Sequence, residues 1–245
     1  ISMKHMAFNY ENYFKSIIEE IKSEGRYRVF IDILRKSQNF PNASWFEDGK
    51  YVKENITVWC SNDYLGMGQN PKVLEEMRKA LEKCGAGSGG TRNISGTTHY
   101  HVELEKDLAS LHGKDSALLF TSGYISNEAT LSTLAGSLKG CIVFSDELNH
   151  SSMIQGIRSS GARKVIFKHN DLEDLNNKIK QFDKNTPKLI AFESVYSMDG
   201  DIAPILEISK IAKENNAITY LDEVHAVGMY GKNGGGISDY LNISD

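Results

Sequence analysis

The sequence predicts an α/β fold whose mainly parallel sheet is covered by helices on both faces, preceded by an N-terminal arm. Two observations carry this prediction. From about residue 99 onward, short apolar runs alternate with longer segments of helical periodicity, which is typical of consecutive strand–helix–strand units. The apolar runs are nearly continuous rather than alternately polar, and this indicates strands that are buried on both faces of the sheet.

The N-terminal arm is expected to begin with a helix within residues 10–36. Its apolar residues follow helical spacing: Tyr13, Phe14, Ile17, Ile18 and Ile21. Gly25 is expected to break the helix before the stretch EGRYRVF. Residues 56–60 are predicted to form a short strand, and Pro71 to begin a helix that ends near Lys83. We therefore expect an arm over 1–55, with residues 1–6 interpreted as an expression scar, and a large domain over 56–245.

Five strands and five helices are expected in the large domain after Gly96. The strands are predicted at 117–120, 142–144, 165–167, 189–192 and 219–221. One helix holds Leu104, Leu108 and Leu111, and the others are predicted at 127–134, 152–159, 172–182 and 205–214.

The stretch from Gly85 to Gly90 fits the pattern G-x-G-x-x-G. A dinucleotide-binding turn of this pattern requires a strand before the first glycine and a helix after the last. Here a helix is predicted before it, and the turn-forming stretch TRNISGTTHYH follows. We expect Gly85 to end that helix and the loop to bring its backbone close to a ligand. A dinucleotide-binding module and a flexible connector are the alternatives.

Composition narrows the function classes. The formal net charge is -4 without any basic block, which argues against a nucleic-acid surface. No apolar run approaches the roughly 20 residues that a membrane span needs. Three cysteines without a C-x-x-C pair favour a reducing compartment and are expected to be buried apolar residues. His99 and His101 have no further Cys/His spacing beside them, so no metal site is expected.

Polar or ionisable residues follow nearly every predicted strand. Because the carboxyl ends of parallel strands form the ligand-binding edge of such a sheet, we expect these side chains to form a site. They are Thr121–Tyr124, Ser145–Asp146 with Asn149–His150, Lys168–Asp171, Glu193–Ser194 with Tyr196–Gly200, and Asp222–His225. Together they predict a site for a phosphorylated aromatic ring, with a phosphate cradle at Gly123–Tyr124, an imidazole at His150 and a carboxylate at Asp222.

This constellation resembles the pyridoxal-phosphate enzymes of the aspartate aminotransferase fold, and within them the α-oxoamine synthase family. The resemblance runs from Gly25 to Asp239. It rests on SNDYLGMG, GSGGTRNISGT, SDELNHSSMIQGIR, FKHNDLEDL, ESVYSMDGD and LDEVHAVGMYG. Members of the family join an amino acid to an acyl-CoA. EGRYRVF, TRNISGTTHYH and DEVHAVGMYG match the branch that joins glycine to succinyl-CoA and releases CoA and carbon dioxide.

The resemblance implies roles for the residues that match its motifs. Asp222 would pair with the pyridine nitrogen of pyridoxal 5′-phosphate (PLP), and His150 would stack on the ring. His225 and Ser197 would bond the ring hydroxyl, and the amides of Gly123 and Tyr124 would hold the phosphate.

The resemblance also implies a substrate pocket in a homodimer. Arg28 would grip the distal carboxylate of succinyl-CoA, for which a guanidinium offers a bidentate fork. Thr91 and Asn62 would complete this pocket, with the Thr91 loop offered to the neighbouring subunit. Ser145 and Lys164 would meet the acyl-CoA.

The family's Schiff-base lysine is expected beyond Asp245. We therefore expect this chain to be part of a longer enzyme and to be inactive alone. A bacterial cytoplasm is the expected location, or the mitochondrial matrix if the source is eukaryotic. A family member with another acyl donor, a non-catalytic partner subunit of the same fold and an NAD-binding module remain as alternatives.

Overall fold

The computed structural model describes residues 7–243, which fall in two compact units that divide between Ala86 and Gly87. The boundary expected between residues 55 and 56 falls inside strand β3 (Lys50–Thr57). That strand is hydrogen-bonded along its length to β2 (Asn42–Glu47). A boundary at 55/56 would therefore cut a paired strand.

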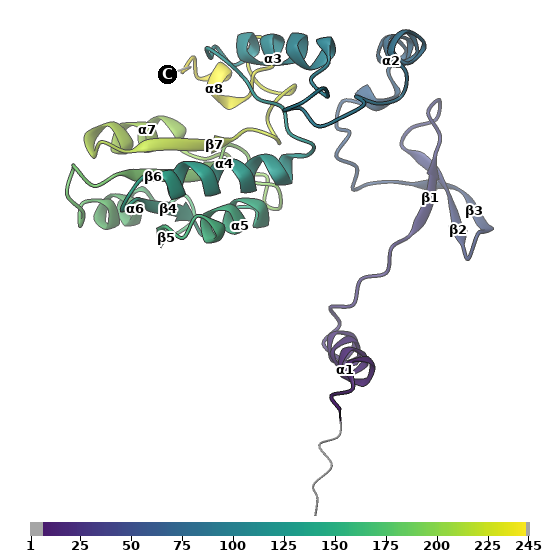
Figure 1. The fold of residues 1–245 in the computed structure, drawn as a ribbon, viewed down its shortest axis with the longest axis horizontal. Helices are drawn as coiled ribbons and strands as arrows, with labels where there is room; N and C mark the ends of the chain where they lie inside the picture. Colours follow the sequence, from purple (N-terminus) through teal and green to yellow (C-terminus); the bar gives the residue numbers. More distant parts are fainter. Residues whose placement is uncertain (1–6, 244–245) are drawn as a thin grey trace, which may run out of the picture. The chain divides into compact units, whose positions relative to one another are not determined.

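The first unit contains a helix, a small antiparallel sheet and a second helix. Helix α1 (Tyr10–Ser23) is capped by Asn9, whose side chain accepts the Asn12 N–H at 3.0 Å. The sheet has the order β1-β2-β3, with β1 at Asp32–Arg35. A 3-10 turn (Met67–Gln69) precedes helix α2 (Pro71–Cys84). Figure 1 shows these elements at the purple end of the chain.

The predicted helix ends at Ser23, just before the expected break at Gly25. Three other features of this unit differ from expectation. The antiparallel sheet that follows the helix was not expected. Of the strand predicted at 56–60, only residues 56 and 57 belong to β3. Cys60 and Cys84 are exposed, because one lies in the loop after β3 and the other at the end of α2, whereas Cys141 is buried as expected.

The second unit is an α/β layer structure with a four-stranded parallel sheet, as predicted (Figure 1). Its strands have the order β5-β4-β6-β7, where β4 is Ile142–Asp146, β5 Arg163–Phe167, β6 Lys188–Glu193 and β7 Ile218–Asp222. Its helices are α3 (His99–Leu111), α4 (Gly123–Ser137), α5 (Ser151–Ser159), α6 (Leu172–Ile179), α7 (Ile205–Glu214) and α8 (Ile237–Tyr240).

Helices cover both faces of this sheet. Successive side chains of a strand point to opposite faces, so neighbouring residues pack against different helices. Phe144 and Ile190 belong to one buried cluster with apolar residues of α6 and α7. Val143 and Leu189 belong to a second buried cluster with apolar residues of α4 and α5. The continuous apolar runs that predicted a doubly covered sheet are thus explained.

The strand predicted at 117–120 is not formed. The Leu119 N–H donates to a carboxylate oxygen of Glu105 at 2.8 Å, and the Leu119 carbonyl accepts from Arg92 at 3.4 Å. These side chains take the place of a strand ladder. Within residues 7–243 no strand pairs with the outer side of β7, which is therefore an edge of the sheet.

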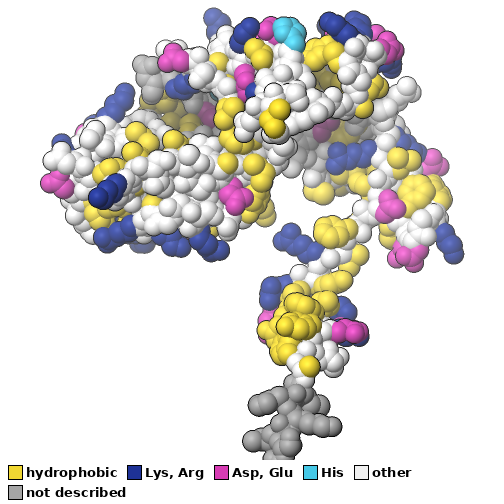
Figure 2. All heavy atoms as spheres, viewed as in Figure 1, with side chains coloured by type: hydrophobic (Ala, Val, Ile, Leu, Met, Phe, Trp, Pro, Cys, Tyr) yellow, Lys and Arg dark blue, Asp and Glu magenta, His cyan; other side chains and the backbone are white. Residues whose placement is uncertain are grey.

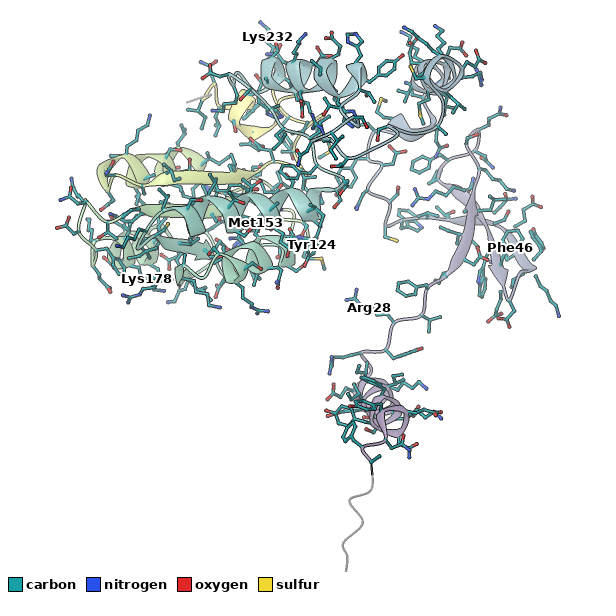
Figure 3. The ribbon with its side chains drawn as sticks, in the orientation of Figure 1. Arg28, Phe46, Tyr124, Met153, Lys178 and Lys232 are labelled. Atoms are coloured by element: carbon teal, nitrogen blue, oxygen red, sulfur yellow. The ribbon has the colours of Figure 1, made fainter. Side chains whose placement is uncertain are left out.

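Helices α4 and α5 cross closely at Gly156. A Cβ atom at this position would lie 2.8 Å from the Asn127 carbonyl oxygen and 2.9 Å from the Leu131 Cβ. Only glycine lets the two backbones approach this closely. Met153, which Figure 3 labels, is fully buried on the same helix.

Candidate active site

The N-terminus of α4 offers an anion site at the ligand-binding edge of the sheet. Ser122 caps the helix, and its hydroxyl accepts the Ile125 N–H at 3.2 Å. The amides of Gly123 and Tyr124 lie in the first turn, where a helix has no carbonyl partner for its N–H groups. The space that a Cβ at Gly123 would enter is open. Free amides and the positive end of the helix together suit a phosphate.

His150 stands at the N-cap of α5 and is exposed. Its Nδ1 accepts the Ser152 N–H at 3.2 Å and lies 2.7 Å from the Ser152 hydroxyl. Its ring meets the Tyr124 ring edge to face, with centroids 6.2 Å apart. The N-terminus of α4 and the imidazole are therefore neighbours, and Figure 3 shows where Tyr124 lies.

Asp222 ends β7 and is partly buried. Its Oδ1 accepts the Val224 N–H at 2.9 Å, and its Oδ2 accepts the side-chain amide of Asn127 at 2.7 Å. Both oxygens of this carboxylate therefore accept a hydrogen bond from an N–H group. His225 follows in the turn after this strand and is half-buried.

Glu193, for which the sequence predicted a place at a strand end but no role, joins two parts of the site. Its carboxylate accepts the His150 N–H at 2.6 Å and also bonds the Ser197 N–H. Burial raises the pKa of Glu193 to about 7; these N–H groups oppose the shift, and the nearby charge of Asp222 adds to it. Ser197 itself is exposed in the loop after β6.

A second polar cluster lies at the same edge of the sheet. His169 bridges two carboxylates: its Nδ1 lies 2.9 Å from Asp146 and its Nε2 2.8 Å from Asp201. The Tyr196 ring packs edge to face against the imidazole, with ring centroids 4.4 Å apart. This bridge fastens the loop that carries Ser197 to the end of β4. Within the described part of the chain, no group of three or more His, Cys, Asp or Glu residues is suited to a metal ion.

The two residues predicted to meet acyl-CoA have different environments. Ser145 is buried in β4, where its hydroxyl accepts the Asn149 side-chain amide at 2.9 Å. Lys164 is exposed on β5. Lys and Arg side chains gather in this part of the second unit in Figure 2. Arg158, Arg163 and Lys168, which are near Lys164 in the sequence, are also exposed.

The glycine-rich loop forms a turn anchored on α3. Gly85 ends α2 with φ +79°, and a helix, not a strand, precedes it, so the context of a dinucleotide-binding turn is missing. The carbonyl of the exposed Thr91 accepts three successive amides, from Ile94 to Gly96. Arg92 makes a bidentate pair with Glu105.

Arg28 and Asn62 belong to the first unit. Figure 3 labels Arg28 on the extended segment between α1 and β1, where it is exposed. Asn62 is exposed in the loop after β3.

The chain is similar to known proteins over most of its length. Residues 54–244 match the family model for aminotransferase class I and II. The chain is 60% identical to 5-aminolevulinate synthase of Rhizobium meliloti over 94% of its own length and 57% of that protein's. It is 53% identical to the non-specific, mitochondrial 5-aminolevulinate synthase of Gallus gallus, over 95% of this chain and 37% of that one.

The chain is also similar in fold to solved structures. A serine palmitoyltransferase from S. paucimobilis with a bound PLP–myriocin aldimine superposes with a TM-score of 0.81 at 32% identity. The match covers 97% of this chain and 58% of that one. The chain thus spans little more than half the length of the bacterial relatives it matches. Among residues 7–243, no helix is both long and apolar enough to cross a membrane.

Proposed function

This chain belongs to the aminotransferase class I and II family, and on that premise we propose that it is part of a 5-aminolevulinate synthase. Such an enzyme uses PLP to condense glycine with succinyl-CoA, giving 5-aminolevulinate, CoA and carbon dioxide. Identities of 60% and 53% to a bacterial and a vertebrate synthase support this. The observation that carries it is the grouping of a free helix N-terminus, an exposed imidazole and the carboxylate of Asp222 at one edge of the sheet.

The residues present fit PLP. The first-turn amides of Gly123 and Tyr124 would hold its phosphate, and His150 would lie against the ring. Asp222 would keep a proton at the ring nitrogen, and a charge-assisted bond of this kind contributes about 1.5–3 kcal/mol. PLP with a protonated ring nitrogen supplies an electron sink for the pair left on glycine when its α-carbon loses a proton.

Ser197 and His225 complete the cofactor side of the proposal. Both would bond the hydroxyl of the ring. Glu193 supports this role for Ser197, because its carboxylate holds the Ser197 N–H and the His150 N–H together. Ser197 and His150, which lie in different segments, would thereby keep a fixed spacing around the PLP ring.

The proposed substrate-binding residues are of the kinds that would bind a carboxylate and a CoA thioester. Arg28 would pair with the distal carboxylate of succinyl-CoA, and Asn62 and Thr91 would line the same pocket. Thr91 would reach the neighbouring subunit of a homodimer. Ser145 and Lys164 would meet the acyl-CoA. Because relatives of both bacterial and mitochondrial origin exist, we place the protein in a bacterial cytoplasm, or in the matrix if its source is eukaryotic.

The donor preference of an Arg28→Leu variant tests this function. The protein expressed from its complete coding sequence is given PLP, glycine and either succinyl-CoA or acetyl-CoA, and CoA release is followed. We expect succinyl-CoA to be preferred. The variant should lose at least about tenfold in kcat/KM for succinyl-CoA, the value of one charged pair, and little for acetyl-CoA.

Arg35→Leu is the matched control, since Arg35 is an exposed arginine of β1 in the same unit. It should leave both donors unchanged. Preference for acetyl-CoA in the unmodified protein would indicate another condensing enzyme of the family. Absence of CoA release with either donor would indicate a non-catalytic partner subunit.

A further inference from the structure

Asn127 occupies the centre of a buried hydrogen-bond network behind the candidate site. It lies on α4, one turn after the helix start, and only 8% of it is exposed. Its Nδ2 donates to Asp222 Oδ2 at 2.7 Å and to Ser152 Oγ at 3.0 Å. Its Oδ1 accepts the hydroxyl of Tyr220 at 2.7 Å. One side-chain amide thus uses both of its N–H bonds and its carbonyl oxygen.

The chemistry of its partners fixes the orientation of this amide. An ionised carboxylate can only accept hydrogen bonds, so the nitrogen and not the oxygen of Asn127 must face Asp222. The oxygen then faces Tyr220, which must donate. Burial raises the pKa of Tyr220 to about 12, and the charge of Asp222 adds to the shift, so the hydroxyl keeps its proton at neutral pH.

The network also determines which nitrogen of His150 carries a proton. The backbone N–H of Ser152 can only donate, and it points at His150 Nδ1 at 3.2 Å. Because Nδ1 accepts this N–H, it has no proton to give, and the Ser152 hydroxyl 2.7 Å away must donate to it while accepting from Asn127. Nδ1 therefore accepts twice and holds no proton, which leaves the proton of the neutral ring on Nε2.

We propose that Asn127 is a positioning residue that holds the carboxylate of Asp222 in place and sets the tautomer of His150. Tyr220 fixes the amide, one N–H of the amide holds the carboxylate, and the other acts on His150 through the Ser152 hydroxyl. Gly156 makes the network possible, since it lets α5 approach the Asn127 backbone. The role of the network towards PLP rests on the proposed function, whereas the tautomer of His150 does not.

The first experiment measures the His150 tautomer by ¹⁵N NMR of histidine-labelled protein, expressed from its complete coding sequence and without PLP. The His150→Gln variant assigns the signal. We expect the unmodified protein to show an unprotonated Nδ1 and a protonated Nε2. Ser152→Ala and Asn127→Ala should each raise the fraction of the Nδ1–H form, because the hydroxyl that donates to Nδ1 is removed or freed to turn. A protonated Nδ1 in the unmodified protein would overturn the proposal.

The second experiment measures the Kd of PLP by absorbance titration. Asn127→Ala should weaken binding by about tenfold or more, the effect of losing one hydrogen bond to a charged group. Asn127→Asp should weaken PLP binding further at neutral pH, because the new carboxylate would lie beside that of Asp222 and repel it. Its affinity should recover as the pH falls, since a protonated carboxyl regains a donor. A purely structural role of Asn127 would produce no such recovery.

The control is Asn215→Ala, which removes another buried asparagine amide, from the end of α7, where it bonds the Ile211 carbonyl. It should change neither the His150 signal nor the Kd. An Asn127→Ala protein that keeps both the tautomer and the Kd of the unmodified protein would overturn the inference. Failure of the unmodified protein to bind PLP would instead overturn the proposed function, and the NMR result would then decide the inference by itself.

Discussion

The backbone N–H of His150 donates to a carboxylate oxygen of Glu193 at 2.6 Å. Glu193 is 2% exposed, and it stands beside Asp222 in the register of β6 and β7. A buried carboxyl thus links the start of α5 to the end of β6, between two residues of the candidate site. Its environment makes the stability of this unit depend on pH.

Glu193→Gln should flatten that pH dependence. The pKa of Glu193 is raised in the folded protein from the usual 4.5 to about 7, so its contribution to stability is full below pH 4.5 and is lost as the pH rises to about 7. Over this window the free energy of unfolding should fall by on the order of 3 kcal/mol because of this group.

Urea unfolding at several pH values checks this prediction. The Gln variant should lack that part of the slope, and Glu207→Gln, which changes an exposed carboxylate on α7, should keep it. An unchanged slope in Glu193→Gln would contradict the assignment.

His169→Asn should release the loop that carries Ser197. Burial opposes the charged form, yet the bonds to Asp146 and Asp201 raise the pKa of His169 overall. Its contribution to stability is therefore full below pH 6.5 and is lost as the pH rises through the raised value. We expect the variant to lose about 1–3 kcal/mol at about pH 6 and less at higher pH. Thermal unfolding at about pH 6 and at a higher pH measures these losses, with the exposed His99→Asn as the control. Equal losses of stability at the two pH values would contradict the bridge from His169 to Asp146 and Asp201.

Glu105→Gln should loosen both the glycine-rich loop and the segment around Leu119. The bond from Arg92 and the Leu119 N–H lower the pKa of Glu105 to about 2. The stability from this carboxylate is present above pH 4.5 and is lost as the pH falls to about 2. The variant should melt at a lower temperature than the unmodified protein at neutral pH, with the difference closing in acid. Glu103→Gln, whose partner Lys106 is an exposed neighbour, should melt nearly normally at neutral pH; a matching loss there would refute a specific role for Glu105.

Gly156→Ala should force α4 and α5 apart. The added methyl group would meet backbone and Cβ atoms at 2.8–3.0 Å, and overpacking of this kind costs about 1–3 kcal/mol. Gly87→Ala is the control, because a Cβ there meets nothing within 4 Å. Denaturant unfolding of both variants tests the prediction, and equal stabilities would show that the helices can separate freely.

The local signals of the sequence predicted the parallel sheet and most of its helices. Helix α7 has the predicted bounds, because its apolar spacing is strong and Pro204 precedes it. The segment 117–120 has a strand-like composition, but a strand also needs a partner, and pairing is not a local property. The antiparallel sheet of the first unit had a signal that was not used: Asp48 and Gly49, both with positive φ, form the turn between β2 and β3.

The candidate site could be predicted only in part for the same reason. Asp222 and His150 follow strands at the edge where parallel sheets bind ligands, so position alone suggested them. Asn127 resembles any polar residue of a helix in the sequence, and its bond to Asp222 joins residues 95 positions apart. Glu193 was noted only as a residue that follows a strand, because nothing in the sequence shows that it bonds the backbone at His150.

The most direct test of the whole account is the rate of 5-aminolevulinate formation by the unmodified protein and by its Asp222→Asn variant, expressed from the complete coding sequence. Both are assayed with saturating PLP, glycine and succinyl-CoA. The account predicts rapid formation by the unmodified protein and a loss of at least about tenfold in the variant, which keeps the shape of the side chain but not its charge. No 5-aminolevulinate from the unmodified protein, or equal rates from the two, would contradict it.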